Sequence, residues 1–168
     1  MQLLVSLIVI IIGLVSCTSQ TANNKESANL AIAKKYMEAV ESENVATMDS
    51  LLSDSYVGYG PSVGDSTNKV QALESFKDNA ENLYESFDYT RHKELAVSVD
   101  TGELKGDWVL NWAYLTIKYK DGRGPINLWI NAVYRIEDGK IVHSRTFYNE
   151  ADAFRQLGYT MAAAEVSQ

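Results

Sequence analysis

The sequence contains a single cysteine, two prolines and only 15 basic residues in a length of 168. One cysteine can form neither an internal disulfide nor a cysteine-rich zinc site, and the low content of proline and glycine excludes a collagen-like or low-complexity chain. Acidic residues number 22, which gives a formal net charge of −7, and no basic run is longer than Lys34-Lys35. This charge pattern argues against binding to nucleic acid. The composition, 46% hydrophobic and 22% charged, is that of one globular domain.

An apolar run without any charge occupies residues 3–15, and the first charged residue is Lys25. The run is shorter than the roughly 20 apolar residues of a membrane-spanning helix and fits the hydrophobic region of a secretory signal. It ends in Ser16-Cys17, which resembles the bacterial lipoprotein signal, where a small residue precedes the cysteine that receives the lipid. The resemblance implies a signal peptide over residues 1–16 and a lipid anchor on Cys17. The alternative is an ordinary signal peptide with an incidental cysteine.

The segment that follows, residues 17–28, is polar and lacks large apolar side chains. It cannot bury enough surface to offset the entropy cost of ordering, so we expect a flexible tether. Thr18, rather than an Asp, follows the cysteine, and this resembles the pattern that sends lipoproteins of Gram-negative bacteria to the outer membrane. The sequence therefore predicts an acidic domain held to the bacterial cell envelope by a lipid anchor.

Helical spacing dominates the first half of the remaining chain. Apolar residues from Leu30 to Val40 recur every three or four positions, as on one face of an amphipathic helix. Asn44 is a suitable N-cap for a short helix over 45–52. The longest helical pattern runs from Val70 to Phe87, and a final short helix over 151–157 is expected to end at a glycine.

Strand-forming residues with a period of two dominate the second half. A short strand is expected over 55–59, and four longer runs cover roughly 88–99, 105–119, 126–136 and 140–149, separated by turns rich in Gly and Asp. Helices followed by an antiparallel meander predict an α+β domain, with the helices packed on one face of the sheet.

Five short stretches carry a family resemblance, together with this order of elements. They are the stretches 35–40, 44–54, 138–141, 147–150 and 155–158. The chain resembles the nuclear transport factor 2-like superfamily of ketosteroid isomerases, limonene epoxide hydrolases and SnoaL-like cyclases, and its ending is similar to SnoaL-like domains in particular. The resemblance implies a cone over residues 29–158, in which three N-terminal helices pack on a curved, mainly antiparallel sheet. A short C-terminal helix and a tail over 159–168 complete it.

Three positions that carry acids in the related enzymes hold other residues here. The resemblance aligns the general-base Asp of the isomerases with Gly60, their oxyanion-hole Asp with Ala132, and the general-acid Asp of the cyclases with Asn149. Losing such a group forfeits about 10²–10⁴-fold in rate. We therefore expect binding of a small hydrophobic or aromatic ligand without catalysis and without a cofactor. The alternative is a cyclase- or isomerase-type enzyme for a polyketide- or steroid-like substrate, in which Tyr36 hydrogen-bonds a developing enolate oxygen.

Two further patterns support weaker hypotheses. Residues 60–64 match the G-x-S-x-G nucleophile motif, but helical periodicity begins only near Asn68, so a turn-rich loop is favoured over an esterase site. His92 and His143 are the only histidines, and neither belongs to a spacing typical of a metal site. We therefore expect no bound metal.

Alternation along the predicted strands assigns side chains to two faces of the sheet. In the run over 105–119 both faces are largely apolar, so the outer face must contact something. Trp129 and Val133 belong to this outer face, where we expect a homodimer of the kind that many members of this family form. An alternative is that the inward aromatic rings are only core filler. The residues expected to line the cone are Tyr36, Tyr59, Phe76, Asn111, Tyr134, Ser144, Thr146, Tyr148 and Asn149.

Overall fold

A six-stranded sheet is the framework of the protein in the computed structural model, which describes residues 23–162. The strand order is β2-β1-β6-β5-β4-β3. β1 pairs with β6 in parallel, and the other neighbouring strands pair antiparallel, so the expected mainly antiparallel sheet is confirmed. The strands are β1 (Leu52–Tyr59), β2 (Ser66–Asn68), β3 (Tyr84–Val99), β4 (Gly106–Tyr119), β5 (Ile126–Glu137) and β6 (Lys140–Tyr148).

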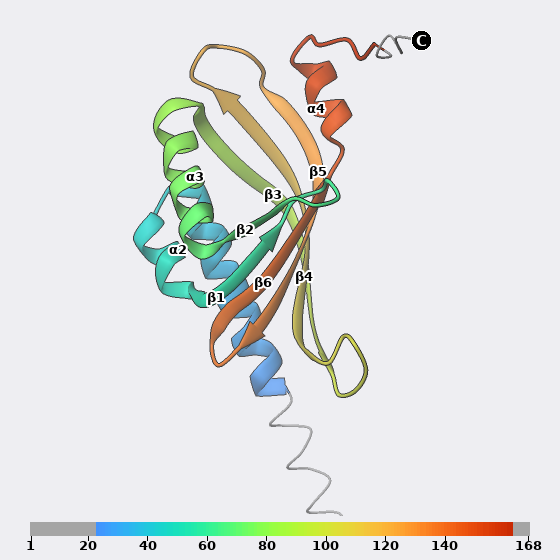
Figure 1. The fold of residues 1–168 in the computed structure, drawn as a ribbon. Coiled ribbons are helices and arrows are strands. Elements are labelled where there is room, and N and C mark those ends of the chain that lie inside the picture. The colour runs from blue at the N-terminus through green and yellow to red at the C-terminus, as the bar shows by residue number, and fades with distance from the viewer. Residues whose placement is uncertain (1–22, 163–168) are drawn as a thin grey trace, which may run out of the picture.

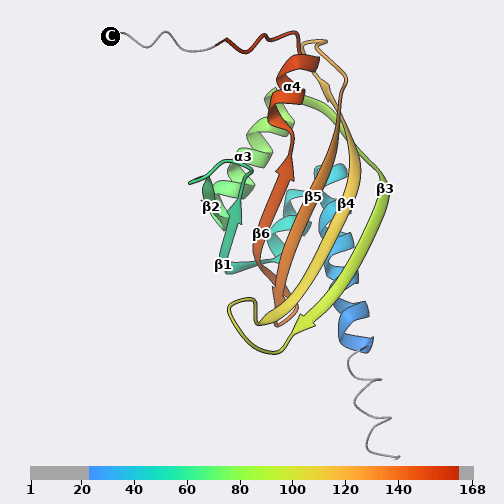
Figure 2. The same ribbon diagram turned by 90° about the vertical axis from the view of Figure 1, so that its right-hand side faces the viewer.

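Three helices cover one face of the sheet, which curves around them (Figure 1 and Figure 2). They are the N-terminal helix, residues 23–41, α2 (Val45–Leu51) and α3 (Lys69–Asn82). The last helix, α4 (Glu150–Gln156), lies at one end of the sheet and packs against β5. The expected α+β cone, with helices on the concave face of the sheet, is confirmed. Within residues 23–162, no helix has the length and apolar character needed to span a membrane.

The N-terminal helix starts earlier than its apolar pattern predicts. Residues 23–28, which their polar composition assigns to a tether, are helical, so the tether does not include them. Lys25 Nζ lies 2.7 Å from Asp107 Oδ2 at the start of β4, and this ion pair ties the first turn to the sheet. An ion pair between residues so far apart in the sequence cannot be predicted from hydrophobic periodicity. Cys17, with the rest of residues 1–22, lies outside the described residues.

α3 is shorter than predicted, because it ends at Asn82 and Phe87 belongs to β3. The side-chain ammonium of Lys120, beyond the end of β4, donates to the carbonyl oxygens of Ala80 and Glu81 at 2.8 and 2.7 Å. A cation at the last carbonyls stabilises the end of a helix. The end of α3 is therefore set by a residue distant in the sequence, which local periodicity cannot reveal.

Alternating side chains of β4 and β5 divide into an inner, concave face and an outer face. Val109, Asn111 and Ala113 of β4 are 0% exposed, whereas the intervening Trp112 is 41% exposed. On β5, Trp129 is 59% exposed between buried neighbours of the inner face. The predicted assignment of these residues to two faces is confirmed, and both faces carry apolar side chains.

One inward position on β6 departs from strict alternation. The pairing of β5 with β6 shifts so that Arg135 faces His143 but Ile136 faces Ile141. Strict alternation with Ser144 would turn Val142 inward. Instead, Ile141 is 0% exposed and is part of the core beneath the N-terminal helix. A bulge of this kind adds one residue and reverses the parity of the strand beyond it.

Replacing Asn68 should destabilise the domain through the start of α3. Asn68 Oδ1 accepts from the backbone N–H of Gln71 at 3.0 Å, and Gln71 Oε1 accepts from the N–H of Asn68 at 3.1 Å, which makes a capping box. Asn68→Ala should lower the free energy of unfolding by about 1 kcal/mol in urea denaturation. Asn82→Ala, at the other end of the helix, should change it by less than about 0.5 kcal/mol. Equal effects of the two substitutions would contradict the capping role.

Candidate functional site

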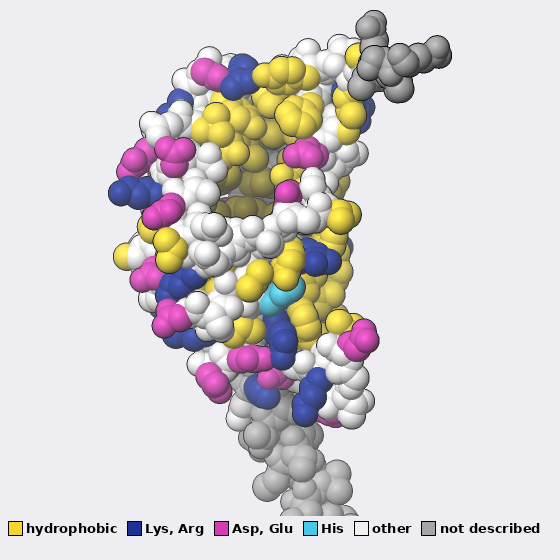
Figure 3. Space-filling model, in the orientation of Figure 1, with side chains coloured by type: hydrophobic (Ala, Val, Ile, Leu, Met, Phe, Trp, Pro, Cys, Tyr) yellow, Lys and Arg dark blue, Asp and Glu magenta, His cyan; other side chains and the backbone are white. Residues whose placement is uncertain are grey.

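A cavity of about 340 Å³ opens between the concave face of the sheet and α4. Figure 3 shows a hollow lined by hydrophobic side chains in the upper part of the molecule, beside α4. A cavity that is mostly apolar and carries a few polar groups is the usual form of a small-molecule site. The lining residues are Tyr84, Tyr89, Leu115, Ile117, Tyr119, Ile126, Leu128, Ile130, Thr146, Tyr148, Glu150, Ala153, Phe154 and Leu157.

The sheet wall of this cavity follows from the period-two alternation of three strands. Leu115 of β4 pairs with Leu128 of β5, and Ile130 of β5 pairs with Tyr148 of β6. Paired residues in an antiparallel sheet point to the same face, so these side chains form one continuous surface. Thr146, two residues before Tyr148, extends the surface toward the interior.

The remaining wall comes from α4, which is capped at its start and hydrogen-bonded to β5 near its end. Asn149 Oδ1 accepts from the backbone N–H of Asp152 at 3.1 Å and caps the start of the helix. At the other end, Gln156 Oε1 accepts from the N–H of Asn127 at 2.8 Å, while Gln156 Nε2 donates to the Asn127 carbonyl at 2.9 Å. This reciprocal pair joins α4 to the backbone of β5. The position of the cavity wall therefore depends on side-chain to backbone hydrogen bonds.

A β-bulge in β3 determines which of its side chains reach the interior. The pairing of β3 with β4 shifts within residues 90–93, and Arg91 adopts a left-handed backbone with φ of 56°. Tyr89 lines the cavity, and His92 lines a second cavity on the same side of the strand. Strict alternation would place Tyr89 and His92 on opposite faces. The bulge re-aims the later side chain, as bulges beside functional sites commonly do.

Tyrosine rings and hydroxyl groups occupy the narrow inner end of the cone. Tyr36 of the N-terminal helix packs edge-on against Tyr134 of β5, with 5.9 Å between ring centroids. The hydroxyl oxygens of Tyr56 and Ser144 are hydrogen-bonded at 2.7 Å. The interior is thus apolar in its walls and polar at its inner end.

Burial keeps the inner tyrosines protonated. It raises the pKa of Tyr89 to about 12, with a further contribution from the carboxylate of Glu41. Burial also raises the pKa of Tyr36 and of Tyr134 well above the ordinary value of a phenol. A neutral phenol can donate and accept hydrogen bonds, but it cannot abstract a proton at neutral pH. These groups are suited to orienting a polar atom.

Asn111 places an unpartnered amide in the middle of the concave face. The side chain is 0% exposed, and neither its nitrogen nor its oxygen has a hydrogen-bond partner among residues 23–162. Leaving a buried polar group unsatisfied costs about 1–3 kcal/mol, so such groups often mark functional sites. Asn111 pairs with Ala132, which in turn pairs with Thr146 of the cavity wall. Asn111 and Thr146 therefore lie in one row across the sheet, with only the small side chain of Ala132 between them.

The structure distributes the predicted lining residues over two depths of the cone. Thr146 and Tyr148 line the cavity directly. Tyr36, Tyr134 and Ser144 lie further in, with Tyr36 and Tyr134 packed in or against the core beneath the N-terminal helix. Asn111 lies between these two groups along β4. For these residues of β4, β5 and β6, alternation alone was sufficient to assign the side chains to the concave face.

Three of the predicted lining residues lie elsewhere. Tyr59 pairs with Arg145 at the edge of the parallel β1–β6 ladder, and the Arg145 guanidinium lies 4.7 Å from its ring centroid on the outer side of the sheet. Phe76 of α3 stacks on Phe87 of β3 at 6.0 Å and is not among the residues that line the cavity. Asn149 uses its side-chain oxygen to cap α4. The register of β1 is set by pairing with a strand distant in sequence, so its faces were not predictable locally.

Several lining residues were missed by the sequence analysis. Tyr119 shares the parity of Leu115 along β4, so extending the alternation would have found it. Tyr84 falls in the stretch predicted as the end of the long helix, and its place on β3 follows only from pairing with Tyr119. The α4 residues Phe154 and Leu157 reach the cavity through the docking of that helix, for which the sequence contains no signal.

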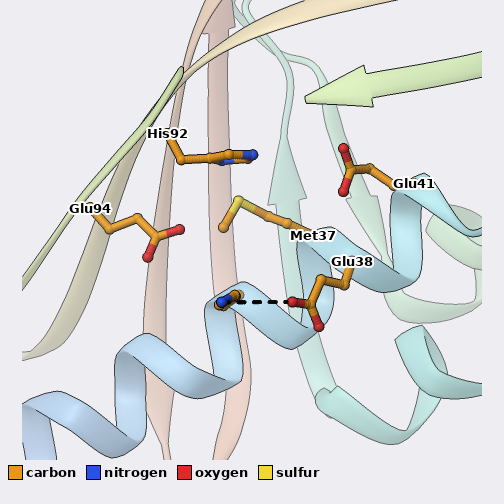
Figure 4. A pocket seen from close by; sticks show the side chains of 6 residues that line it. Met37, Glu38, Glu41, His92 and Glu94 are labelled. Atoms are coloured by element: carbon orange, nitrogen blue, oxygen red, sulfur yellow. Dashed lines mark ion pairs between the residues drawn. The ribbon is translucent and has the colours of Figure 1, made fainter. Parts of the chain in front are cut away.

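A second cavity of about 290 Å³ lies between the N-terminal helix and β3, and it shares no lining residue with the first (Figure 4). Lys34 pairs with Glu38 at 4.0 Å, and His92 Nε2 lies 3.0 Å from the Tyr89 carbonyl oxygen. The other histidine, His143, packs against aromatic rings of the outer face. In the described part of the chain, no cluster of three or more His, Cys, Asp or Glu side chains could hold a metal ion. The lining residues are Lys34, Met37, Glu38, Glu41, His92 and Glu94.

The three residues at the positions aligned with enzymatic acids do not line the cavity. Gly60 begins the exposed turn between β1 and β2, in which Ser62 of the G-x-S-x-G stretch is exposed and is followed by a strand rather than a helix. Ala132 is 3% exposed on the inner face and carries no polar group. Asn149 caps α4. Neither an elbow nucleophile nor a carboxyl group stands at these positions.

Comparison with solved structures relates this architecture to known proteins. An NTF2-like protein from Burkholderia pseudomallei superposes with a TM-score of 0.62 at 14% identity, covering 79% of this chain and 98% of that one. IdmH from Streptomyces antibioticus gives 0.59 at 19% identity, covering 77% and 97%. An LEH-like epoxide hydrolase from M. tuberculosis gives 0.59 at 15% identity, covering 79% and 91%. At these identities the likeness establishes the fold alone.

Comparison at the level of sequence gives the family. Among curated proteins no significant match was found. The model of the SnoaL-like domain matches residues 33–144, which include the N-terminal helix from Ala33 and every strand up to the middle of β6. The match therefore spans the elements that build the cone. The chain belongs to the family of SnoaL-like domains and has its nuclear transport factor 2-like fold.

Proposed function

We propose that this domain binds a small, largely hydrophobic organic molecule in the cavity beside α4 and performs no reaction on it. The observation that carries the proposal is the cavity of about 340 Å³ with its aliphatic and aromatic wall. Burying apolar ligand surface there contributes about 25 cal/mol for each Å² removed from water. The ligand therefore gains most of its affinity from the wall and its orientation from the few polar groups.

The polar groups suited to orient the ligand lie on the concave face of the sheet. Thr146 and Tyr89 line the cavity, and burial holds the Tyr89 hydroxyl in its neutral form. Asn111, in the same row of the sheet as Thr146, carries an amide without a partner among the described residues. Neutral donors and acceptors of this kind suit a carbonyl or hydroxyl group of the ligand.

The absence of an acid–base pair in the cavity wall supports binding without catalysis. Among the described residues that line it, Glu150 is the one carboxylate, and no histidine takes part. The positions aligned with catalytic acids hold Gly60, Ala132 and Asn149. General acid–base catalysis requires a titratable group within reach of the reacting atoms.

A second candidate function is favoured by one observation, the neutral phenols of the interior. Such groups can stabilise a developing oxyanion, as a cyclase or isomerase requires. IdmH, with which this chain shares its fold, is described as a candidate polyketide cyclase. Conversion of a polyketide- or steroid-like ligand to a product of different structure by the purified protein would favour this alternative, with Tyr36 among the donors.

Filling the cavity should abolish ligand binding. Ile130 is 6% exposed and lines the cavity, so Ile130→Trp should displace a bound molecule. We expect a discrete small molecule to co-purify with the full chain, to be identifiable by mass spectrometry after extraction, and to be lost in this variant. Val63→Trp, at a fully exposed position of the β1–β2 turn, should retain it. The proposal fails if the wild-type protein carries no small molecule, or if the folded Ile130→Trp variant retains it equally.

We further propose that a lipid on Cys17 anchors this domain to the bacterial outer membrane. Support comes from the apolar run before Ser16-Cys17 and from Thr18 after it. The intact mass of protein from the membrane fraction should show cleavage before Cys17 and a diacylglyceryl adduct. Cys17→Ser should remove the adduct and release the domain from that fraction. Membrane-fraction protein without the adduct would disprove the anchor.

The outer face of the sheet supports a proposed homodimer. Trp112, Trp129 and Phe147 are 41%, 59% and 45% exposed on this face, and Val133 lies beside them. An exposed apolar surface of this kind is typical of an interface between proteins. A second copy of the chain, packed back to back, would bury it.

Placing a charge in this face should separate the two copies. Trp129→Arg should convert a dimer to a monomer in light scattering at micromolar concentration, because each interface would then bury two unpaired charges. Val70→Arg introduces the same charge at a 62% exposed site on α3, on the opposite side of the sheet, and should leave the dimer intact. A monomeric wild-type protein at this concentration would refute the dimer.

A further inference from the structure

The mouth of the cavity gathers three tyrosine rings from three strands. Tyr84 of β3 and Tyr119 of β4 form a corner, with 5.3 Å between ring centroids and 59° between planes. Tyr148, the last residue of β6, lines the same mouth. All three rings line the cavity, whose deeper wall is aliphatic. The mouth is therefore chemically distinct from the interior.

Carboxylates give this aromatic mouth a negative potential. Glu150, the first residue of α4, lines the cavity next to Tyr148. The pKa of Tyr148 is raised first by burial and then by the negative charges of Glu150 and Asp65. In Figure 3, acidic side chains stand at the edge of the hydrophobic hollow. An anionic ligand group would be repelled at this position.

The nearby cation does not cancel this potential. The Arg123 guanidinium lies 5.5 Å from the Tyr119 ring centroid, and Arg123 is not among the residues that line the cavity. Its Nε is 2.6 Å from Asp121 Oδ2, so its charge is already paired. The carboxylate of Glu150 has no ion-pair partner among residues 23–162. A cationic group on the ligand would therefore be the partner of the Glu150 carboxylate.

The three tyrosine rings and the single carboxylate of the mouth favour binding of an organic cation over a metal ion. Faces of aromatic rings attract an alkylammonium group through their quadrupole, and a carboxylate adds to this attraction in a partly desolvated site. Calcium and magnesium instead require six or more oxygen ligands, mostly carboxylates, carbonyls and water, which this mouth does not provide. An alkylated ammonium also loses less hydration than a small ion on entering an apolar cavity.

We propose that the cavity binds an amphiphilic organic cation, with its ammonium group between Tyr84, Tyr119 and Tyr148 beside Glu150. The apolar body of the ligand then lies against Leu128 and Ile130. This inference rests on the proposed binding function and adds to it the charge of the ligand and the direction in which it enters. The charged end stays at the mouth, and the neutral end faces the inner hydroxyl groups.

Two probes that differ only in charge test this assignment. Benzyltrimethylammonium carries the cation, and neopentylbenzene is its neutral isostere with carbon in place of nitrogen. We expect NMR titration of the full-length protein to give a dissociation constant about tenfold lower for the cation, a ratio in the range of cation–π recognition in partly desolvated sites. Methyl signals of Leu128 and Ile130 should shift with either probe, which places the apolar body in the cavity.

Matched variants distinguish the effects of losing the charge or the ring from the effect of disturbing the fold. Glu150→Gln and Tyr148→Leu should bring the affinity for the cation to that of the neutral probe, whereas Tyr148→Phe keeps the ring and should keep the preference. Asp152→Asn removes the neighbouring charge from the same turn of α4, at a residue that does not line the cavity. The amide oxygen of Asn can still accept the hydrogen bond that Asp152 Oδ2 accepts from Gln156 Nε2 at 3.0 Å, so neither affinity should change. Comparable Asp152→Asn and Glu150→Gln effects would show that the helix, not the mouth, was disturbed, and would overturn the inference.

The remaining outcomes distinguish this inference from the proposed function. Equal affinity of wild-type protein for the two probes would overturn the cationic ligand and leave the binding cavity in place. Binding of neither probe would also overturn it. The proposed function is then judged separately, by whether the wild-type protein, but not Ile130→Trp, carries a co-purifying small molecule.

Discussion

The register between β4 and β5 is the constraint on which the rest of the structure depends. In this pairing Leu115 faces Leu128 and Trp112 faces Asn131, so one set of side chains forms the cavity wall and the other set the exposed outer face. Because the side-chain period is two, a slip of one residue would exchange these sets. Both faces are apolar, so hydrophobicity alone does not select the register. The register is selected by the helices, which cover one face only and fully bury Val109 and Ala113 beneath them.

Much of the fold was predictable because it rests on local patterns. The helical spacing after Leu30 and the alternation along β4 and β5 predicted the order of elements and the concave face. With the stretches 35–40, 44–54, 138–141, 147–150 and 155–158, this order carried the resemblance to the family. Thr146 and Tyr148 were assigned to the interior by alternation, and the structure places both in the cavity wall. These features need only neighbouring residues, so a single sequence contains them.

What was missed depends on contacts between distant parts of the chain. Lys120 donates to the last carbonyls of α3, and the aromatic residues that follow, Tyr84 and Phe87, belong to β3 rather than to the helix. Tyr59 lies outside the cone because β1 takes its register from β6. The bulge at residues 90–93 reverses the parity of β3 and brings His92 inward. In each case the local pattern was correctly described, but tertiary pairing decided the outcome.

The docking of α4 has a consequence for the energetics of the whole molecule. This seven-residue helix supplies one wall of the cavity but is held to β5 by the reciprocal bonds between Gln156 and Asn127. So short a helix has little stability of its own, so its folded state depends on those bonds and on what it packs against. For the ligand proposed above, occupancy of the cavity and the folding of α4 are therefore thermodynamically linked. By reciprocity, the factor by which folding of α4 raises the affinity for that ligand equals the factor by which the bound ligand raises the folding equilibrium constant of α4.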